Sequence, residues 1–127
     1  MNIVQELRRL KLPRNGYVVV GSGILNALGI RDSNDIDLIV SQKIYDKLEE
    51  AGWQHDNWSD QIVLKKDVFD IGTNWYGLQV TQLLKNAQYV DDIPYLSLDD
   101  VYEWKRRLSR EKDLVDLELI DSYRISQ

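Results

Sequence analysis

Cysteine is absent from the chain, and His55 is its only histidine. The lack of thiols excludes disulfide bonds, zinc–thiolate sites and catalysis by a cysteine nucleophile. It also agrees with a reducing compartment. His55 lies in a polar stretch without an evident partner, so we assign it no role.

Long apolar runs are also missing, because no segment approaches the roughly 20 apolar residues that a membrane-spanning helix needs. The first residues, 1–12, predict an amphipathic helix and lack the apolar centre and small-residue cleavage site of a signal peptide. We therefore expect a cytoplasmic protein with no membrane partner. The net charge of −5 argues against extensive, sequence-independent binding to a nucleic-acid backbone, because such binding needs clustered Lys and Arg. The net charge does not exclude a local basic patch.

The length of 127 residues and the hydrophobic content of 43% suit one compact domain over residues 1–127. Apolar residues at helical spacing predict helices, and β-branched runs predict strands. The helices are expected at residues 2–11, 24–28, 42–52, 80–84, 98–108 and 111–123. The strands are expected at residues 17–20, 35–40, 61–65 and 68–71, with a short extended piece at 93–97.

This order of elements predicts an α/β (α+β) fold, in which a mixed β-sheet is flanked by helices and followed by a helical C-terminal part. Ser41 and Ser97 are expected to cap the helices that follow them. The polar segment 54–60 is predicted to be an exposed loop. The last helix is expected to bury Leu114, Leu117 and Ile120 or their neighbours.

Two carboxylates, Asp35 and Asp37, interrupt an apolar run that otherwise predicts a buried strand. Because side chains alternate along a strand, both point to one face, while Ile36 and Leu38 point to the other. Two like charges this close repel each other unless a cation lies between them. Mg²⁺ commonly joins one or two carboxylates to substrate phosphates. The pair therefore predicts a divalent-metal site, although an isolated Asp-x-Asp more often lies on a solvated strand face.

A third acid and a glycine-rich turn strengthen this hypothesis. Asp70 is flanked by apolar residues in the strand predicted at 68–71, and it joins the pair if that strand is adjacent. The turn Gly21-Ser22-Gly23 closes one strand and opens a helix, where backbone N–H groups and the helix dipole favour an anionic phosphate. By itself such a turn is also typical of a tight connection without a ligand. Together the motifs indicate a metal-assisted phosphate site.

These residues resemble the polymerase-beta-like nucleotidyltransferases, whose mark is a Gly-Ser or Gly-Gly turn, a short helix and an acidic pair in the next strand. The resemblance is greatest to small bacterial members grouped with abortive-infection toxins, toxin–antitoxin components and antibiotic nucleotidyltransferases. Here 21-GSG-23 is similar to the turn, and 31-RDSNDIDLIV-40 is similar to an Arg-x-Ser-x-Asp-Ile-Asp-Leu segment. The C-terminal 105-KRRLSREKDLVDLELI-120 is similar to the basic segment that follows the sheet. The resemblance thus covers about residues 17–120.

The resemblance implies a single nucleotidyltransferase-like domain that transfers a nucleoside monophosphate from an NTP to an acceptor. In that role Asp35, Asp37 and Asp70 are both the catalytic and the metal-binding residues, and Mg²⁺ or Mn²⁺ is the cofactor. The turn Gly21-Ser22-Gly23 would bind phosphates. The acceptor is an RNA end, a protein hydroxyl or a small molecule, and the sequence does not rank these.

A basic run follows the predicted sheet, and five of the 16 Lys and Arg residues fall between positions 105 and 112. Lys105 and Lys112 are seven residues apart and share a face if the helix is continuous. We expect both to bind the nucleotide phosphates. The alternative is a solvated helix face.

Arg31 is a further nucleotide-binding candidate, and its alternative is a salt bridge that orients Asp35 or Asp37. Asp113 and Asp116 are expected to pair with nearby basic side chains. Five aromatic residues are candidates for stacking on a base, although most aromatic residues in a small domain fill the core: Trp53, Trp58, Trp75, Tyr76 and Trp104.

Three other interpretations stay open. In the first, the chain is a catalytically inactive relative that acts as a binding or antitoxin-like partner protein. In the second, the chain forms a homodimer in which a neighbouring subunit completes the site. The glycine turn and the acids are also compatible with an unrelated magnesium-dependent phosphate site. The short chain favours the first two interpretations, and the retained acids favour an enzyme.

Overall fold

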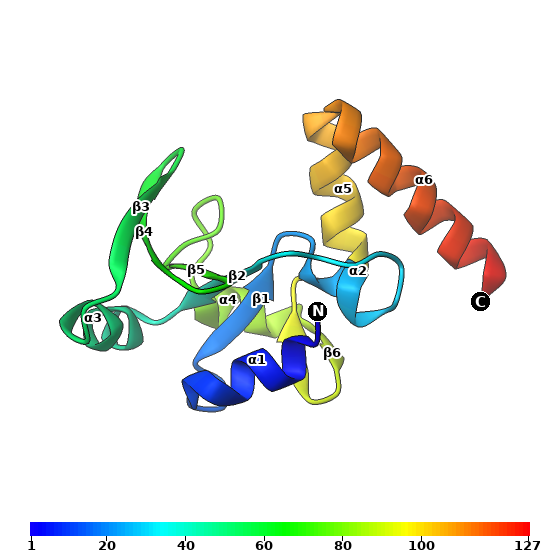
Figure 1. Cartoon of the computed structure of the whole chain (residues 1–127). Helices are drawn as coiled ribbons and strands as arrows, with labels where there is room; N and C mark the ends of the chain where they lie inside the picture. The colour runs from blue at the N-terminus through cyan, green and yellow to red at the C-terminus, as the bar shows by residue number, and fades with distance from the viewer.

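The computed structural model describes residues 1–127 and confirms the predicted α+β class with a helical C-terminal part (Figure 1). The helices are α1 (Ile3–Leu10), α2 (Gly23–Ala27), α3 (Gln42–Glu50), α4 (Val80–Lys85), α5 (Leu98–Leu108) and α6 (Glu111–Ser126). The strands are β1 (Tyr17–Val20), β2 (Ile36–Val40), β3 (Gln54–Trp58), β4 (Gln61–Lys66), β5 (Phe69–Gly72), β6 (Gln88–Val90) and β7 (Ile93–Tyr95). None of the helices has the length and apolar character that crossing a membrane requires.

All seven strands form one mixed sheet in the order β3-β4-β5-β2-β1-β7-β6. β2 lies antiparallel to β1 and parallel to β5, so the two strand regions predicted at 17–40 and 61–71 are joined at the centre of the sheet. Consecutive residues of β2, Leu38 and Ile39, are both fully buried. A strand whose successive side chains are all buried is covered on both faces. Polar side chains in this strand therefore need a special environment.

The segment predicted as the exposed loop 54–60 is instead largely strand β3, which forms a hairpin with β4. Its residues are polar because β3 is an edge strand with little of its surface buried, so the alternating apolar pattern of a half-buried strand is missing. His55 on this strand does have a partner, because its Nε2 lies 2.7 Å from Glu49 Oε2. β6 is a second short edge strand that the sequence did not predict.

The helix boundaries follow the expected capping chemistry. The Ser41 hydroxyl accepts a hydrogen bond from the Ile44 N–H, and the Ser97 hydroxyl accepts one from the Asp100 N–H. Each bond satisfies a backbone donor that has no partner inside its helix. The second cap starts α5 at the predicted residue.

The C-terminal helices α5 and α6 form a hairpin that stands at one end of the molecule, away from α3 and the β3–β4 hairpin (Figure 1). The chain turns at Ser109, whose φ is 49°, so the basic run is divided between the two predicted helices. The condition under which Lys105 and Lys112 would share one helix face is therefore not met. Of the three apolar residues named for α6, Ile120 is fully buried and Leu117 is partly buried. Leu114 is 51% exposed, and the other buried residues of α6 are Asp113 and Asp116.

Candidate functional site

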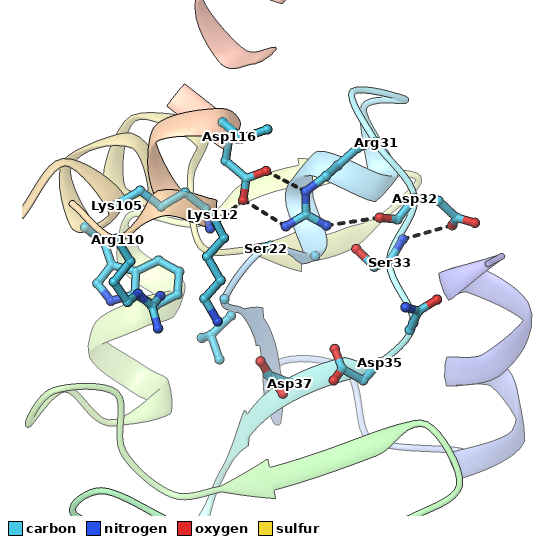
Figure 2. A pocket seen from close by; sticks show the side chains of 16 residues that line it. Ser22, Arg31, Asp32, Ser33, Asp35, Asp37, Lys105, Arg110, Lys112 and Asp116 are labelled. Atoms are coloured by element: carbon cyan, nitrogen blue, oxygen red, sulfur yellow. Dashed lines mark hydrogen bonds and ion pairs between the residues drawn. The ribbon is translucent and has the colours of Figure 1, made fainter. Parts of the chain in front are cut away.

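A cavity of about 580 Å³ lies between the β1–α2 turn, the loop that leads into β2, and the α5–α6 hairpin (Figure 2). It brings together eight of the nine residues that the sequence predicts for the site: Gly21, Ser22, Gly23, Arg31, Asp35, Asp37, Lys105 and Lys112. Asp70 does not line it. Segments that are distant in the sequence thus converge on one polar hollow.

The glycine turn lies directly against the acidic strand. Gly21 has a φ of +63°, and a Cβ atom built there would be 2.8 Å from Asp37 Oδ2. Glycine is required both for the left-handed conformation and for the close approach to the carboxylate. Ser22 follows as the residue before α2, and its hydroxyl makes no capping hydrogen bond. Because α2 has only five residues, the Ser22 hydroxyl and the backbone N–H groups matter more here than the helix dipole.

Asp35 and Asp37 face this turn without protein partners. Figure 2 shows both side chains at the floor of the cavity with no hydrogen bond or ion pair drawn to either. Burial, together with the negative charges of Asp35 and Asp70, raises the pKa of Asp37 to about 7. Asp35 is exposed just before β2 begins. The pair is therefore a concentration of negative charge that nothing in the chain fully compensates.

Asp70 lies beside the pair but is held by a lysine. It is the register partner of Asp37 across the parallel strands β2 and β5, so both side chains project from the same face of the sheet. On its other side Asp70 is the register partner of Lys65, whose Nζ donates a hydrogen bond of 3.0 Å to Asp70 Oδ1. This bond raises the pKa of Lys65. No group of three or more His, Asp or Glu side chains is arranged to hold a metal ion.

Arg31 forms an ion pair, but its partner is Asp116 and not an acid of the β2 pair. The Arg31 Nε and Nη2 atoms lie 2.7 and 2.9 Å from the two carboxylate oxygens of Asp116 on α6. The third guanidinium nitrogen, Nη1, donates to the Asp32 carbonyl oxygen at 3.0 Å. Arg31 therefore borders the cavity as a clamp between the loop and α6, and its donors are largely engaged.

Lys105 is also engaged by protein groups. Its side chain is 3% exposed, and its Nζ lies 2.8 Å from Asp116 Oδ2 and 3.7 Å from Asp113 Oδ1. Although burial favours the neutral acids, the hydrogen bonds from Arg31 and Lys105 hold the pKa of Asp116 below its ordinary value. The expected pairing of Asp113 and Asp116 with basic side chains is confirmed. Lys105 thus belongs to a buried ion cluster and is not free to bind phosphate.

Lys112 differs from Lys105 in both exposure and pairing. It is exposed, it forms no ion pair, and Figure 2 shows its side chain extending from α6 into the cavity toward Asp37. Among the predicted basic residues it is the one with an available ammonium group.

Sequence reasoning missed Ser33, which lines the cavity. Trp104, a stacking candidate, and Arg110, part of the basic run, also line it, although the sequence did not assign them to this cavity. The Ser33 hydroxyl is buried and has no hydrogen-bond partner, which marks it as a group that a ligand can satisfy. Its position in the segment 31–40 was the available signal. Arg110 borders the cavity while its Nε donates to Asp113 at 2.6 Å. Only tertiary structure reveals that Arg110 and Trp104 reach this site.

No family model, curated protein or solved structure matches the chain.

Proposed function

We propose that the protein is a magnesium-dependent nucleotidyltransferase that moves a nucleoside monophosphate from an NTP to an acceptor hydroxyl. The observation that carries this proposal is the shared cavity of Asp35, Asp37, the Gly21-Ser22 turn and Lys112. An acidic pair without partners faces a free cation across a hollow that holds a free hydroxyl. A metal-bound triphosphate has the complementary charges, because it offers both a divalent cation and anionic oxygens.

The donor set fits Mg²⁺. Asp35 and Asp37 are hard oxygen ligands, and the raised pKa of Asp37 indicates negative charge that a divalent cation would relieve. Mg²⁺ commonly uses one or two carboxylates with substrate phosphates, so a cage of three acids is not required. The chemistry that Mg²⁺ would supply there is neutralisation of phosphate charge and polarisation of the reacting phosphoryl group.

The chain itself would position the phosphates and the acceptor. The Ser22 and Ser33 hydroxyls donate to phosphate oxygens, and Lys112 adds a compact positive charge from α6. In the transfer step the acceptor oxygen bonds to the α-phosphorus, the bond to the bridging oxygen breaks, and pyrophosphate leaves. The acceptor proton would be taken up by the Asp70 carboxylate, which lies beside Asp37 in the sheet. Positioning and electrostatics account for most of the catalysis of this reaction class, so no covalent nucleophile is needed.

A second candidate is a noncatalytic nucleotide-binding or antitoxin-like partner protein. The hydrogen bond from Lys65 to Asp70 favours it, because a carboxylate oxygen held by an ammonium group is less available to a metal ion or an acceptor hydroxyl. On this view the cavity binds NTP and Mg²⁺ without transfer.

The deciding experiment incubates the protein with each NTP, Mg²⁺ and pools of RNA, proteins or metabolites. Pyrophosphate release and mass spectrometry of the pools are the readouts. The proposed function predicts a product heavier by one nucleoside monophosphate, which is absent with EDTA and in the double variant Asp35→Asn/Asp37→Asn. A magnesium-dependent NTP shift of the melting temperature without pyrophosphate in any pool would support the second candidate instead.

A further inference from the structure

A second cavity of about 400 Å³ adjoins the candidate site, and four of the 11 residues that line it are aromatic. The two cavities share the lining residues Asp37, Trp104, Arg110 and Lys112. The rings at the second cavity are Trp58, Trp75, Tyr76 and Trp104. Trp53, the remaining tryptophan, is buried in the core against Phe69 and has no part in it.

The four rings are assembled from three separate parts of the chain. Trp58 ends β3, Trp75 and Tyr76 lie in the loop after β5, and Trp104 lies on α5. The Trp75 ring centroid is 5.0 Å from those of both Tyr76 and Trp104, and all the contacts are edge-on. Edge-on packing leaves ring faces that neighbouring rings do not cover.

Tyr76 is the most accessible ring of the group. It is 64% exposed, although a large aromatic side chain gains free energy from burial. Its backbone φ is 49°, an uncommon value for a residue other than glycine, and its hydroxyl accepts a hydrogen bond of 3.0 Å from Trp104 Nε1. The exposed ring is thus held in a defined position at the cavity.

We infer that this aromatic cavity binds the nucleobase of the NTP by stacking, with the phosphates directed past Lys112 toward Asp35 and Asp37. The inference rests on the proposed function for the position of the phosphates. Base and phosphates of one nucleotide lie at opposite ends of a short molecule, and the two cavities meet at Asp37 and Lys112. Aromatic side chains stack on any base because every base has a π-face.

The test measures binding of three probes to the full chain: ATP with Mg²⁺, adenosine, and inorganic tripolyphosphate with Mg²⁺. Tyr76→Asn removes the ring while keeping a residue that tolerates the left-handed conformation. Tyr76→Phe keeps the ring without its hydroxyl. Tyr89→Ala is the matched control, because Tyr89 is also exposed, at 55%, but lies on β6 outside both cavities.

Tyr76→Asn should weaken ATP and adenosine binding by about 5- to 100-fold and leave tripolyphosphate binding unchanged. Tyr89→Ala should bind all three probes like the original protein. Tyr76→Phe keeps the ring but loses the hydrogen bond from Trp104, so it should lose less affinity for ATP and adenosine than Tyr76→Asn. Bound adenosine should also quench tryptophan fluorescence, because three tryptophans line the cavity. A thermal melt of each variant confirms that it is folded.

Unchanged ATP affinity in folded Tyr76→Asn would overturn the base-stacking inference, as would a protein that binds tripolyphosphate but not adenosine. The latter result leaves the phosphate site of the proposed function standing. If adenosine binding depends on the Tyr76 ring but the transfer assay releases no pyrophosphate, the base-stacking inference is supported and the proposed transfer function is contradicted.

Discussion

Lys105 and Asp116 form a buried ion pair, with 2.8 Å between the ammonium nitrogen and a carboxylate oxygen. Arg31 donates two further hydrogen bonds to the same carboxylate. Asp116 therefore links α5, α6 and the loop that leads into β2. The position of α6, and with it that of Lys112, depends on a carboxylate that lies across the cavity from the acidic pair (Figure 2).

Replacing this carboxylate should be costly. Asp116→Ala leaves the buried Lys105 ammonium without its nearest partner, and we expect a loss of about 3–5 kcal/mol in the free energy of unfolding. Urea denaturation followed by circular dichroism measures it. The matched control is Asp99→Ala, which removes an exposed ion pair with Arg124 between the same two helices. Similar stability losses in both variants would contradict the central role of Asp116.

The two lysines of the basic run should behave differently. Lys112→Ala should weaken binding of NTP with Mg²⁺ by about 5- to 100-fold without destabilising the fold, because its exposed ammonium has no protein partner. Lys105→Ala should instead lower the melting temperature, because it leaves Asp113 and Asp116 with less compensation. Calorimetric titration and thermal melts separate the two effects.

Arg107→Ala is the control for this comparison, since Arg107 is an exposed cation of the same run that does not line the cavity. It should bind NTP like the original protein. Equal affinities for Lys112→Ala and Arg107→Ala would show that Lys112 is an ordinary solvated lysine on the helix surface.

The sequence predicts the central sheet well because its signals are local. The β-branched run at 17–20 and the apolar residues around Asp37 define β1 and β2 without reference to other elements. The alternation that places Asp35 and Asp37 on one face is likewise a property of the strand alone. Edge strand β3 has no such signal, since its mostly exposed side chains are polar.

The partners of the charged residues depend on tertiary structure. Arg31 and Asp116 are 85 positions apart, and no local pattern indicates that they meet. The burial of Lys105 is equally unpredictable, because an isolated lysine on a helix is normally solvated. The turn at Ser109 is what folds α6 back so that Asp113 and Asp116 enclose it.

The close contact between Gly21 and Asp37 yields a further prediction. Gly21→Ala introduces a Cβ atom 2.8 Å from Asp37 Oδ2 and forces a positive φ on alanine. We expect a loss of about 1–3 kcal/mol in stability and a reduced NTP shift of the melting temperature. Gly29→Ala is the matched control, because Gly29 also has a positive φ but nothing lies within 4 Å of its added Cβ. It should leave the NTP shift unchanged.

The raised pKa of Asp37 predicts a pH dependence for the metal-free protein. An acid whose pKa is about 7 when folded, and near 4 when unfolded, binds more protons in the folded state between these values. Stability should therefore fall as the pH rises from 4 to 7, and ionised Asp37 should cost up to about 4 kcal/mol above pH 7. Asp37→Asn removes this cost, so it should stabilise the protein at pH 8 and have little effect at pH 4.5. Urea denaturation in EDTA at both pH values measures the difference, with the exposed α6 substitution Glu118→Gln as control. An equal effect of Asp37→Asn on the free energy of unfolding at the two pH values would show that the pKa of Asp37 is not raised in the folded protein.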